Sequence, residues 1–200
     1  GLIGSYPMAL VVNAHDGFGS VADIVNRARQ KPGTINVASG GIGSMPHLSA
    51  ELFQMLSSTE LSHVPYKGNA PAVTDLIAGH VSMLFSGLPT VEGYVKEGRL
   101  KVLAVTGRQR HAALPEVPTV EEGGVKGFEV ISWFGLLGPK GLPEPVVALK
   151  DTLDTPAIRE RMAPLGADLS TGTPAEFGAL IRKEVALWAD VVKTSGVKVQ

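Results

Sequence analysis

The chain has 200 residues, of which 44% are hydrophobic and 18% charged, as in a globular protein large enough to bury its own core. Its net charge is −1 and its basic residues are spread along the chain, which excludes the clustered basic surface of a nucleic-acid-binding protein. It has no cysteine, which excludes disulfides and thiolate metal sites, and no apolar run of the roughly 18 residues needed to cross a membrane.

Local signals predict the first two elements. Residues 8–13 form an apolar run that is typical of a strand. Ser20 is a suitable N-cap for a helix over residues 21–29, and Asp23 stands at the third helical position as in a capping box. Gly33 follows the helix and helps to end it.

A glycine-rich loop follows the next strand, which begins at Ile35. The loop and the start of the helix after it contain the candidate ligand-binding residues Ser39, Gly40, Gly41, Ile42, Gly43, Ser44 and His47. The glycines allow positive φ angles and a close approach of the backbone to a ligand, and Ser44 is a suitable N-cap. Because a helix N-terminus has unpaired N–H groups and partial positive charge, we expect this loop to bind a carboxylate. A tight turn without a ligand explains the pattern equally well.

Strands and helices then alternate. The sequence predicts strands at 61–66, 81–85 and 101–106, and helices at 46–56, 70–78 and 90–97. This alternation with short connections predicts an α/β sheet with parallel neighbours and right-handed crossovers. Ligands of such sheets bind at the carboxyl ends of the strands, so the loops that begin at Ser39, Tyr66, Ser86 and Thr106 are expected along one edge.

The pattern changes after Thr106. Pro118 and Thr119 are expected to begin a short helix, and the apolar run at 128–137 is predicted to cross between two lobes. Helices are predicted at 143–153, with a possible early end at Asp151, and at 156–165. A last helix is expected from Thr173 to about residue 194, because a cap, a proline and a glutamate occur together at its start. Its predicted apolar face consists of Phe177, Leu180, Ile181, Val185, Trp188 and Val192.

Five segments in register resemble one family of proteins. They are residues 38–48, 63–68, 103–106, 114–120 and 132–137. Their order and spacing are similar to those of the Bug-type solute receptors of tripartite tricarboxylate transporter systems. The resemblance extends from about Leu10 to Val192, and the specificity comes from the five segments together.

This resemblance implies a type II periplasmic binding-protein fold, which is an α/β fold of two lobes with a ligand cleft between them. Residues 13–127 would form one complete lobe. Residues 1–12 and 128–200 would form the crossover strands and the C-terminal helices of the other lobe, which is incomplete because members of the family carry a further segment before Leu10. The implied function is that of a periplasmic, non-enzymatic receptor without a cofactor. It would bind a small carboxylate and deliver it to the membrane components of the transporter.

The resemblance also implies which residues form the cleft. The loop from Ser39 to Ser44 matches one of two ligand-binding loops in the family, and Tyr66, Lys67 and Ser86 match further cleft positions. Ser86 replaces an aspartate of the amino-acid-binding members, so an ammonium ligand is not expected. Trp133 either reports closure of the cleft or packs the joint between the lobes.

The sequence allows four other interpretations. Ser44 and His47 could be the nucleophile and base of a hydrolase, but no G-x-S-x-G elbow and no acid partner are evident. A dinucleotide-binding loop fails because Pro46 occupies the position of the last glycine, and the five histidines lack the spacing of metal ligands. The serious alternative is a truncated remnant that folds without binding a ligand. Its C-terminal helices could pair between two copies as a homodimer or domain swap.

Overall fold

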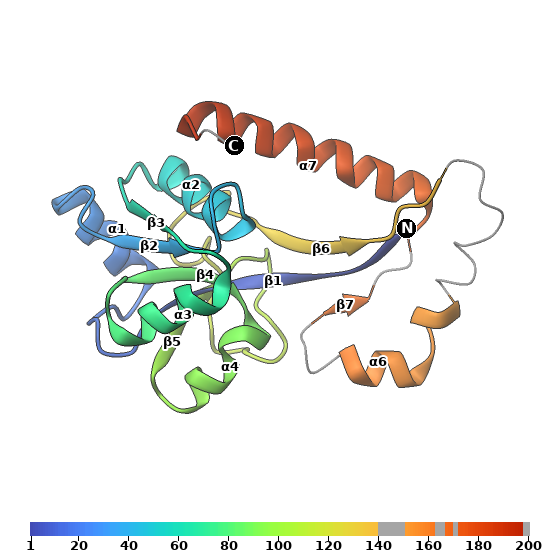
Figure 1. The fold of residues 1–200 in the computed structure, drawn as a ribbon, viewed down its shortest axis with the longest axis horizontal. Coiled ribbons are helices and arrows are strands. Elements are labelled where there is room, and N and C mark those ends of the chain that lie inside the picture. Colours follow the sequence, from blue (N-terminus) through green and yellow to red (C-terminus); the bar gives the residue numbers. More distant parts are fainter. Residues whose placement is uncertain (140–150, 163–166, 170–171, 198–200) are drawn as a thin grey trace.

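The computed structural model describes residues 1–139, 151–162, 167–169 and 172–197 (Figure 1). The strands are β1 (Leu2–Asn13), β2 (Asn36–Ser39), β3 (Ser62–Pro65), β4 (Met83–Gly87), β5 (Leu100–Val105), β6 (Ile131–Gly135) and β7 (Asp168–Leu169). The helices are α1 (Val21–Gln30), α2 (Met45–Ser57), α3 (Asn69–Ala78), α4 (Leu88–Lys96), α6 (Pro156–Met162) and α7 (Pro174–Ser195).

The predicted helix starts at Ser20 and Thr173 are confirmed. The Ser20 hydroxyl accepts a hydrogen bond from the Asp23 N–H at 3.2 Å, and Thr173 and Glu176 form a complete capping box. The helix expected after Pro118 is wrong. Thr119 and Glu122 do exchange capping hydrogen bonds of 2.7 and 3.0 Å, but two glycines follow at once and the chain makes only a turn. The helix expected at 143–153 lies outside the described residues except for its end, where residues 151–153 are helical.

The sheet is mixed: the predicted parallel neighbours are confirmed for β3, β2 and β4, but the prediction is wrong for β1. The strand order is β3-β2-β4-β1-β5, and β2 is parallel to both β3 and β4. β1 lies between β4 and β5 and is antiparallel to both. No helical crossover feeds β1, so nothing constrains it to the direction of the other strands. The strands β2, β3, β4 and β5 still end at one edge of the sheet, as expected.

β1 also joins two parts of the molecule. Its second half pairs with β4 and β5, whereas its first half pairs with β6 and β7. In Figure 1, β1 and β6 run side by side out of the main body of the chain toward the segment that carries β7 and α6. This arrangement is that of a two-stranded connection between lobes. The lobe limits at residues 13 and 127 stay a prediction.

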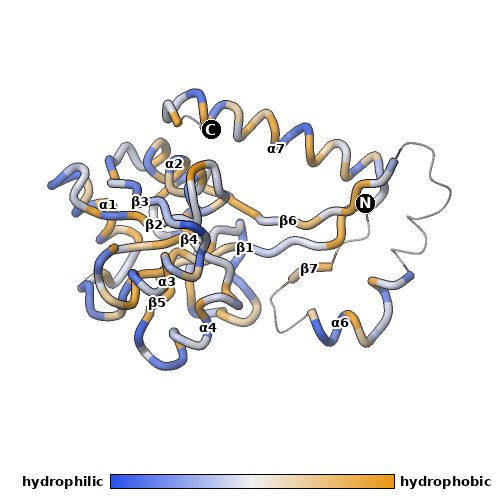
Figure 2. The backbone as a smooth tube through the Cα atoms, viewed as in Figure 1, coloured by the Kyte–Doolittle hydropathy of each residue, from blue (hydrophilic) through white to orange (hydrophobic). Residues whose placement is uncertain are grey.

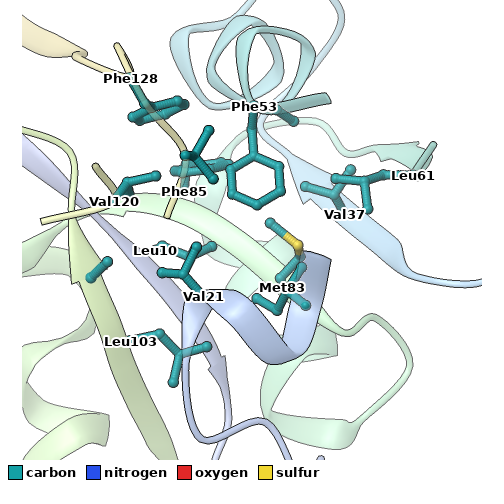
Figure 3. Packing of buried hydrophobic residues seen from close by; sticks show 14 of the residues in the cluster. Leu10, Val21, Val37, Phe53, Leu61, Met83, Phe85, Leu103, Val120 and Phe128 are labelled. Carbon is teal, nitrogen blue, oxygen red and sulfur yellow. The ribbon is translucent and has the colours of Figure 1, made fainter. Parts of the chain in front are cut away.

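The core lies on both faces of the sheet. Met8, Leu10 and Val12 of β1 face one layer, which contains α1 and α2, and Ala9 and Val11 face the other, which contains α3 and α4. Because successive strand side chains point to opposite faces, a run that is buried on both faces is apolar at every position. In the first layer three phenylalanine rings pack at centroid distances of 5.8 to 6.2 Å, as Figure 3 shows for Phe53, Phe85 and Phe128.

α7 packs over β6 and reaches back to α2 (Figure 1). Its residues alternate between hydrophobic and hydrophilic along its length (Figure 2). Phe177 and Val191 are buried, and Trp188 packs against the first core layer as predicted. Val185 is 63% exposed, so its assignment to the apolar face was wrong.

Candidate functional site

The loop between β2 and α2 is closed by its own hydrogen bonds. Gly41 and Gly43 have φ angles of 136° and 77°, which only glycine adopts readily. The Ser44 N–H and the Ser44 hydroxyl both donate to the Gly41 carbonyl, at 3.2 and 2.7 Å. Ser44 therefore stands at the N-cap position of α2 as predicted, but its hydroxyl closes the loop and does not cap the helix.

Two histidines support the loop. The Gly43 N–H donates to His47 Nδ1 at 3.0 Å, so the ring proton of His47 is on Nε2, which lies 3.3 Å from Glu51 Oε1. His63 Nε2 lies 2.6 Å from the hydroxyl oxygen of Ser39. The two imidazole rings stack with centroids 3.7 Å apart and planes 14° from parallel.

Burial keeps both rings neutral. It lowers the pKa of His47, and together with the neighbouring His47 it lowers the pKa of His63 to about 4. Burial also raises the pKa of the Glu51 carboxyl. A pair of neutral rings can stack closely, whereas two imidazolium ions at this distance would repel each other.

These contacts occupy some of the backbone N–H donors of the loop and leave others free for a ligand. The Gly41 N–H donates to the Ser39 hydroxyl at 3.1 Å, and the N–H groups of Gly43 and Ser44 are bonded as described above. The N–H groups of Ile42, Met45 and His47 meet no acceptor within the described ranges of the chain. Ile42 itself is 50% exposed. Three backbone donors around the first turn of α2 are thus available to an anion.

The other predicted site residues lie apart from these donors. The Tyr66 hydroxyl donates to Asp75 Oδ2 at 2.7 Å on the α3 side of the sheet, and burial with this bond raises the pKa of Tyr66 to about 12. Lys67 is exposed. Ser86 is fully buried in β4, where its hydroxyl donates to the Gly87 carbonyl at 3.4 Å. The backbone beyond β3 also bonds the loop, through Tyr66 N–H to the Ser39 carbonyl and Gly68 N–H to the Gly40 carbonyl.

Gly40 is needed where these segments meet. A Cβ on Gly40 would lie 2.6 Å from the side-chain oxygen of Asn69, the first residue of α3. The absent side chain allows the loop and the start of α3 to approach each other.

A pocket of about 410 Å³ lies beside this junction. It is bounded by β1, β6, the starts of α2 and α3, the end of β4 and the middle of α7. Its lining residues include Tyr6, Met45, Asn69, Trp133, Glu184 and Trp188. Of these residues, only Trp133 and Trp188 were named from the sequence, and they are the two tryptophans of the chain. No predicted ligand residue lines the pocket, but Met45 and Asn69 are neighbours of predicted ones in sequence or in space.

The geometry does not support the hydrolase interpretation. The Ser44 hydroxyl donates to a backbone carbonyl, and His47 Nδ1 accepts a backbone N–H, so the two side chains form no nucleophile–base pair. Among the described residues, no group of three or more His, Asp or Glu side chains could hold a metal ion. No described helix combines the length and the apolar character that crossing a membrane requires.

Residues 2–197 match the profile of the TctC family, described as the tripartite tricarboxylate transporter family receptor. The chain belongs to this family. It is 35% identical over 197 residues to the UPF0065 protein in the tcbD-tcbE intergenic region of Pseudomonas sp. strain P51, and 31% identical over 204 residues to Protein BugT of Bordetella pertussis. These matches cover 96% and 100% of the chain, but only 59% and 63% of the two relatives.

Three solved structures are similar to the structure of this chain. Rpa4515 of R. palustris with adipate has a TM-score of 0.88 at 34% identity, and the periplasmic binding protein BugD has 0.86 at 32%. MatC of Rhodopseudomonas palustris with bound malate has 0.83 at 28%. The matches cover 96–100% of the chain and 67–69% of those chains. The expected periplasmic binding-protein fold is therefore confirmed, with one lobe and part of a second.

Proposed function

We propose that this chain is the ligand-binding part of a periplasmic solute receptor that takes a small carboxylate for a tripartite transporter. The observation that carries the proposal is the set of N–H groups at Ile42, Met45 and His47, which surround the first turn of α2 where Met45 reaches the pocket. Helix N-termini bind carboxylates through such donors. Family membership and the adipate and malate bound by structural relatives support the same ligand class.

In this proposal the predicted residues act in two ways. Gly40, Gly41 and Gly43 shape the loop, and the side chains of Ser39, Ser44 and His47 hold it, so that the backbone donors face the ligand. Tyr66, Lys67 and Ser86 do not line the pocket, so this proposal gives them no direct contact with the ligand. The second lobe would close over the ligand, exclude water and present the closed form to the membrane components of the transporter.

The test is to remove one donor without removing the helix. Met45→Pro deletes the Met45 N–H at the first helical position, where proline is tolerated. Ser44 already has the extended backbone that a residue before proline requires, with φ −67° and ψ 157°. Calorimetry with a panel of small mono-, di- and tricarboxylates should show binding that Met45→Pro weakens by about tenfold, the effect of one hydrogen bond to a charged group.

The matched control is Met45→Leu, which changes the same side chain in the pocket but keeps the N–H. Its affinity should stay within about threefold of the parent chain, because the swap conserves shape and polarity. Equal weakening by both substitutions would show that the side chain, and not the backbone donor, matters.

A second candidate function is a remnant that folds without binding and that pairs with another copy. Phe134, Leu136 and Leu137 favour it, because they are 60%, 54% and 76% exposed at and just beyond the end of β6. Exposed apolar groups in series are typical of an interaction surface. Absence of carboxylate binding by this chain, together with self-association, would support this candidate.

A further inference from the structure

The pocket beside α2 has an uneven distribution of charge. Glu184 of α7 is the one charged side chain among its described lining residues, and no lysine, arginine or histidine lines it. Asn69 and Ser132 add neutral polar groups. A ligand whose carboxylate binds at the start of α2 therefore shares the pocket with a second carboxylate, that of Glu184.

The position of Glu184 is fixed by its neighbour on the helix. Glu184 Oε2 accepts the indole N–H of Trp188 at 2.8 Å, and Trp188 packs against the first core layer. Oε1 of Glu184 accepts no hydrogen bond from the part of the chain that the structure describes. One carboxylate oxygen is thus held in place while the other remains available to a donor.

The rest of the wall is largely apolar. The rings of Tyr6 and Phe134 stack with centroids 5.8 Å apart, and Trp133 is held edge-on against Phe177 at 5.3 Å. Tyr6, Phe134 and Trp133 line the pocket, whereas Phe177 does not. Such walls favour the apolar body of a ligand over a chain of polar groups.

We propose that Glu184 determines specificity at the site of the proposed function, on which this inference rests. It selects monocarboxylates that have an apolar body and a hydrogen-bond donor, such as a hydroxyl, at the far end. It disfavours dicarboxylates, because a second ligand carboxylate would face Glu184 in a partly desolvated pocket, where like charges repel more strongly than in water. A hydroxyl instead donates to Oε1 of Glu184 and replaces the water lost on binding.

The experiment uses the fluorescence of the two tryptophans, both of which line the pocket. The 200-residue chain is titrated with hexanoate, 6-hydroxyhexanoate and adipate, which share a six-carbon body and differ at the far end. We expect 6-hydroxyhexanoate to bind about tenfold more tightly than adipate. Glu184→Gln keeps an acceptor for the Trp188 N–H and removes the charge, so it should reduce the difference to less than about threefold.

The control is Asp190→Asn, which makes the same change of charge at an exposed position of the same helix outside the pocket. It should keep the tenfold preference. Adipate binding as tightly as 6-hydroxyhexanoate in the parent chain, or a preference that survives Glu184→Gln, overturns the role of Glu184 and leaves the proposed function standing. Lack of any response to all three compounds overturns both proposals for this chain. Met45→Pro should weaken all three ligands alike and leave their order unchanged.

Discussion

The stacked pair of His47 and His63 connects the glycine loop to the core below it. Each ring uses one nitrogen to hold a different part of the loop, through Gly43 and through Ser39. The His47 contact depends on a neutral ring, because protonated His47 would have no lone pair for the Gly43 N–H, and two charged rings at this distance would repel each other. The loop geometry is therefore coupled to the protonation of His47, which is buried, and of His63, which is half-buried.

This coupling predicts that the free energy of unfolding decreases as the pH becomes acidic. The pKa of His63 is lowered to about 4 in the folded chain from an ordinary 6.5, so between these values the unfolded chain binds more protons. The contribution of neutral His63 to the free energy of unfolding is complete above pH 6.5 and is lost as the pH falls toward 4. In urea unfolding, the free energy should decrease by about 1–3 kcal/mol from pH 7 to pH 5.

His63→Gln tests the source of this slope. Glutamine can still accept a hydrogen bond from Ser39 but does not titrate, so the decrease between pH 7 and pH 5 should become smaller. The raised pKa of Glu51 acts in the opposite direction, and comparing the variant with the parent chain removes that shared contribution. His15→Gln, at an exposed position, should keep the parent slope. An unchanged slope in His63→Gln would show that the histidine stack is not responsible.

Sequence analysis predicted the position of this loop but not its internal bonds. The glycines, Ser44 as the N-cap position and the strand before them are local features that neighbouring residues determine. His63 comes from the next strand, and the stacking of its ring on His47 depends on the register between β2 and β3. No spacing within the sequence reports such a register, so the contact of His63 with the loop was not predicted.

At the scale of elements, helix caps were predictable and strand direction was not. Ser20 and Thr173 start helices through bonds that span three residues, and the sequence contains both partners. β1 takes its antiparallel place through partners about 75 to 95 residues later, such as Gly87 and Val105. The turn at Thr119 shows the limit of cap signals, because its capping bonds form but glycines prevent propagation of a helix.

The contact between β6 and α7 gives a prediction at this scale. Gly135 ends β6 directly under the buried ring of Phe177, and a Cβ on Gly135 would overlap that ring. Gly135→Ala should therefore push the start of α7 away from β6 and decrease the free energy of unfolding by about 1–3 kcal/mol, as overpacking does. Urea unfolding measures the change.

Gly93→Ala is the matched control for that substitution. Gly93 lies within α4, and a Cβ there meets no atom within 4 Å. Alanine should increase stability by about 0.5–1 kcal/mol, because it restricts the unfolded chain and favours the helix. If Gly135→Ala also stabilised the chain, the packing of α7 on β6 would not be as tight as the structure has it.

At the scale of the molecule, the residues that line the pocket could not be predicted from the sequence. Its wall combines Tyr6, Asn69, Trp133 and Glu184, which lie in four distant parts of the chain. The family resemblance supplied the fold, and the loop at Ser39–Ser44 pointed only to the neighbouring residues Met45 and Pro46, which line the pocket. The remaining wall depends on how β1, β6 and α7 pack together.

The exposed groups after β6 give a prediction about association. Leu136 and Leu137 should promote self-association of the 200-residue chain at tens of micromolar, because burying them between copies removes apolar surface from water. Sedimentation velocity should show that Leu136→Ser with Leu137→Ser shifts the chain toward monomer. Val185→Ser, at an equally exposed apolar position on α7, should leave the mass distribution unchanged. A monomer in all three cases would remove the dimer hypothesis.

The central place of β1 has a consequence for synthesis. Met8 to Val12 are at most 3% exposed, yet their partners Met83–Gly87 and Leu100–Val105 leave the ribosome much later. Until then this apolar run has no partner strands in the growing chain. The sheet can close only after β5 is made, so this part of the chain stays incompletely folded over a long stretch of translation.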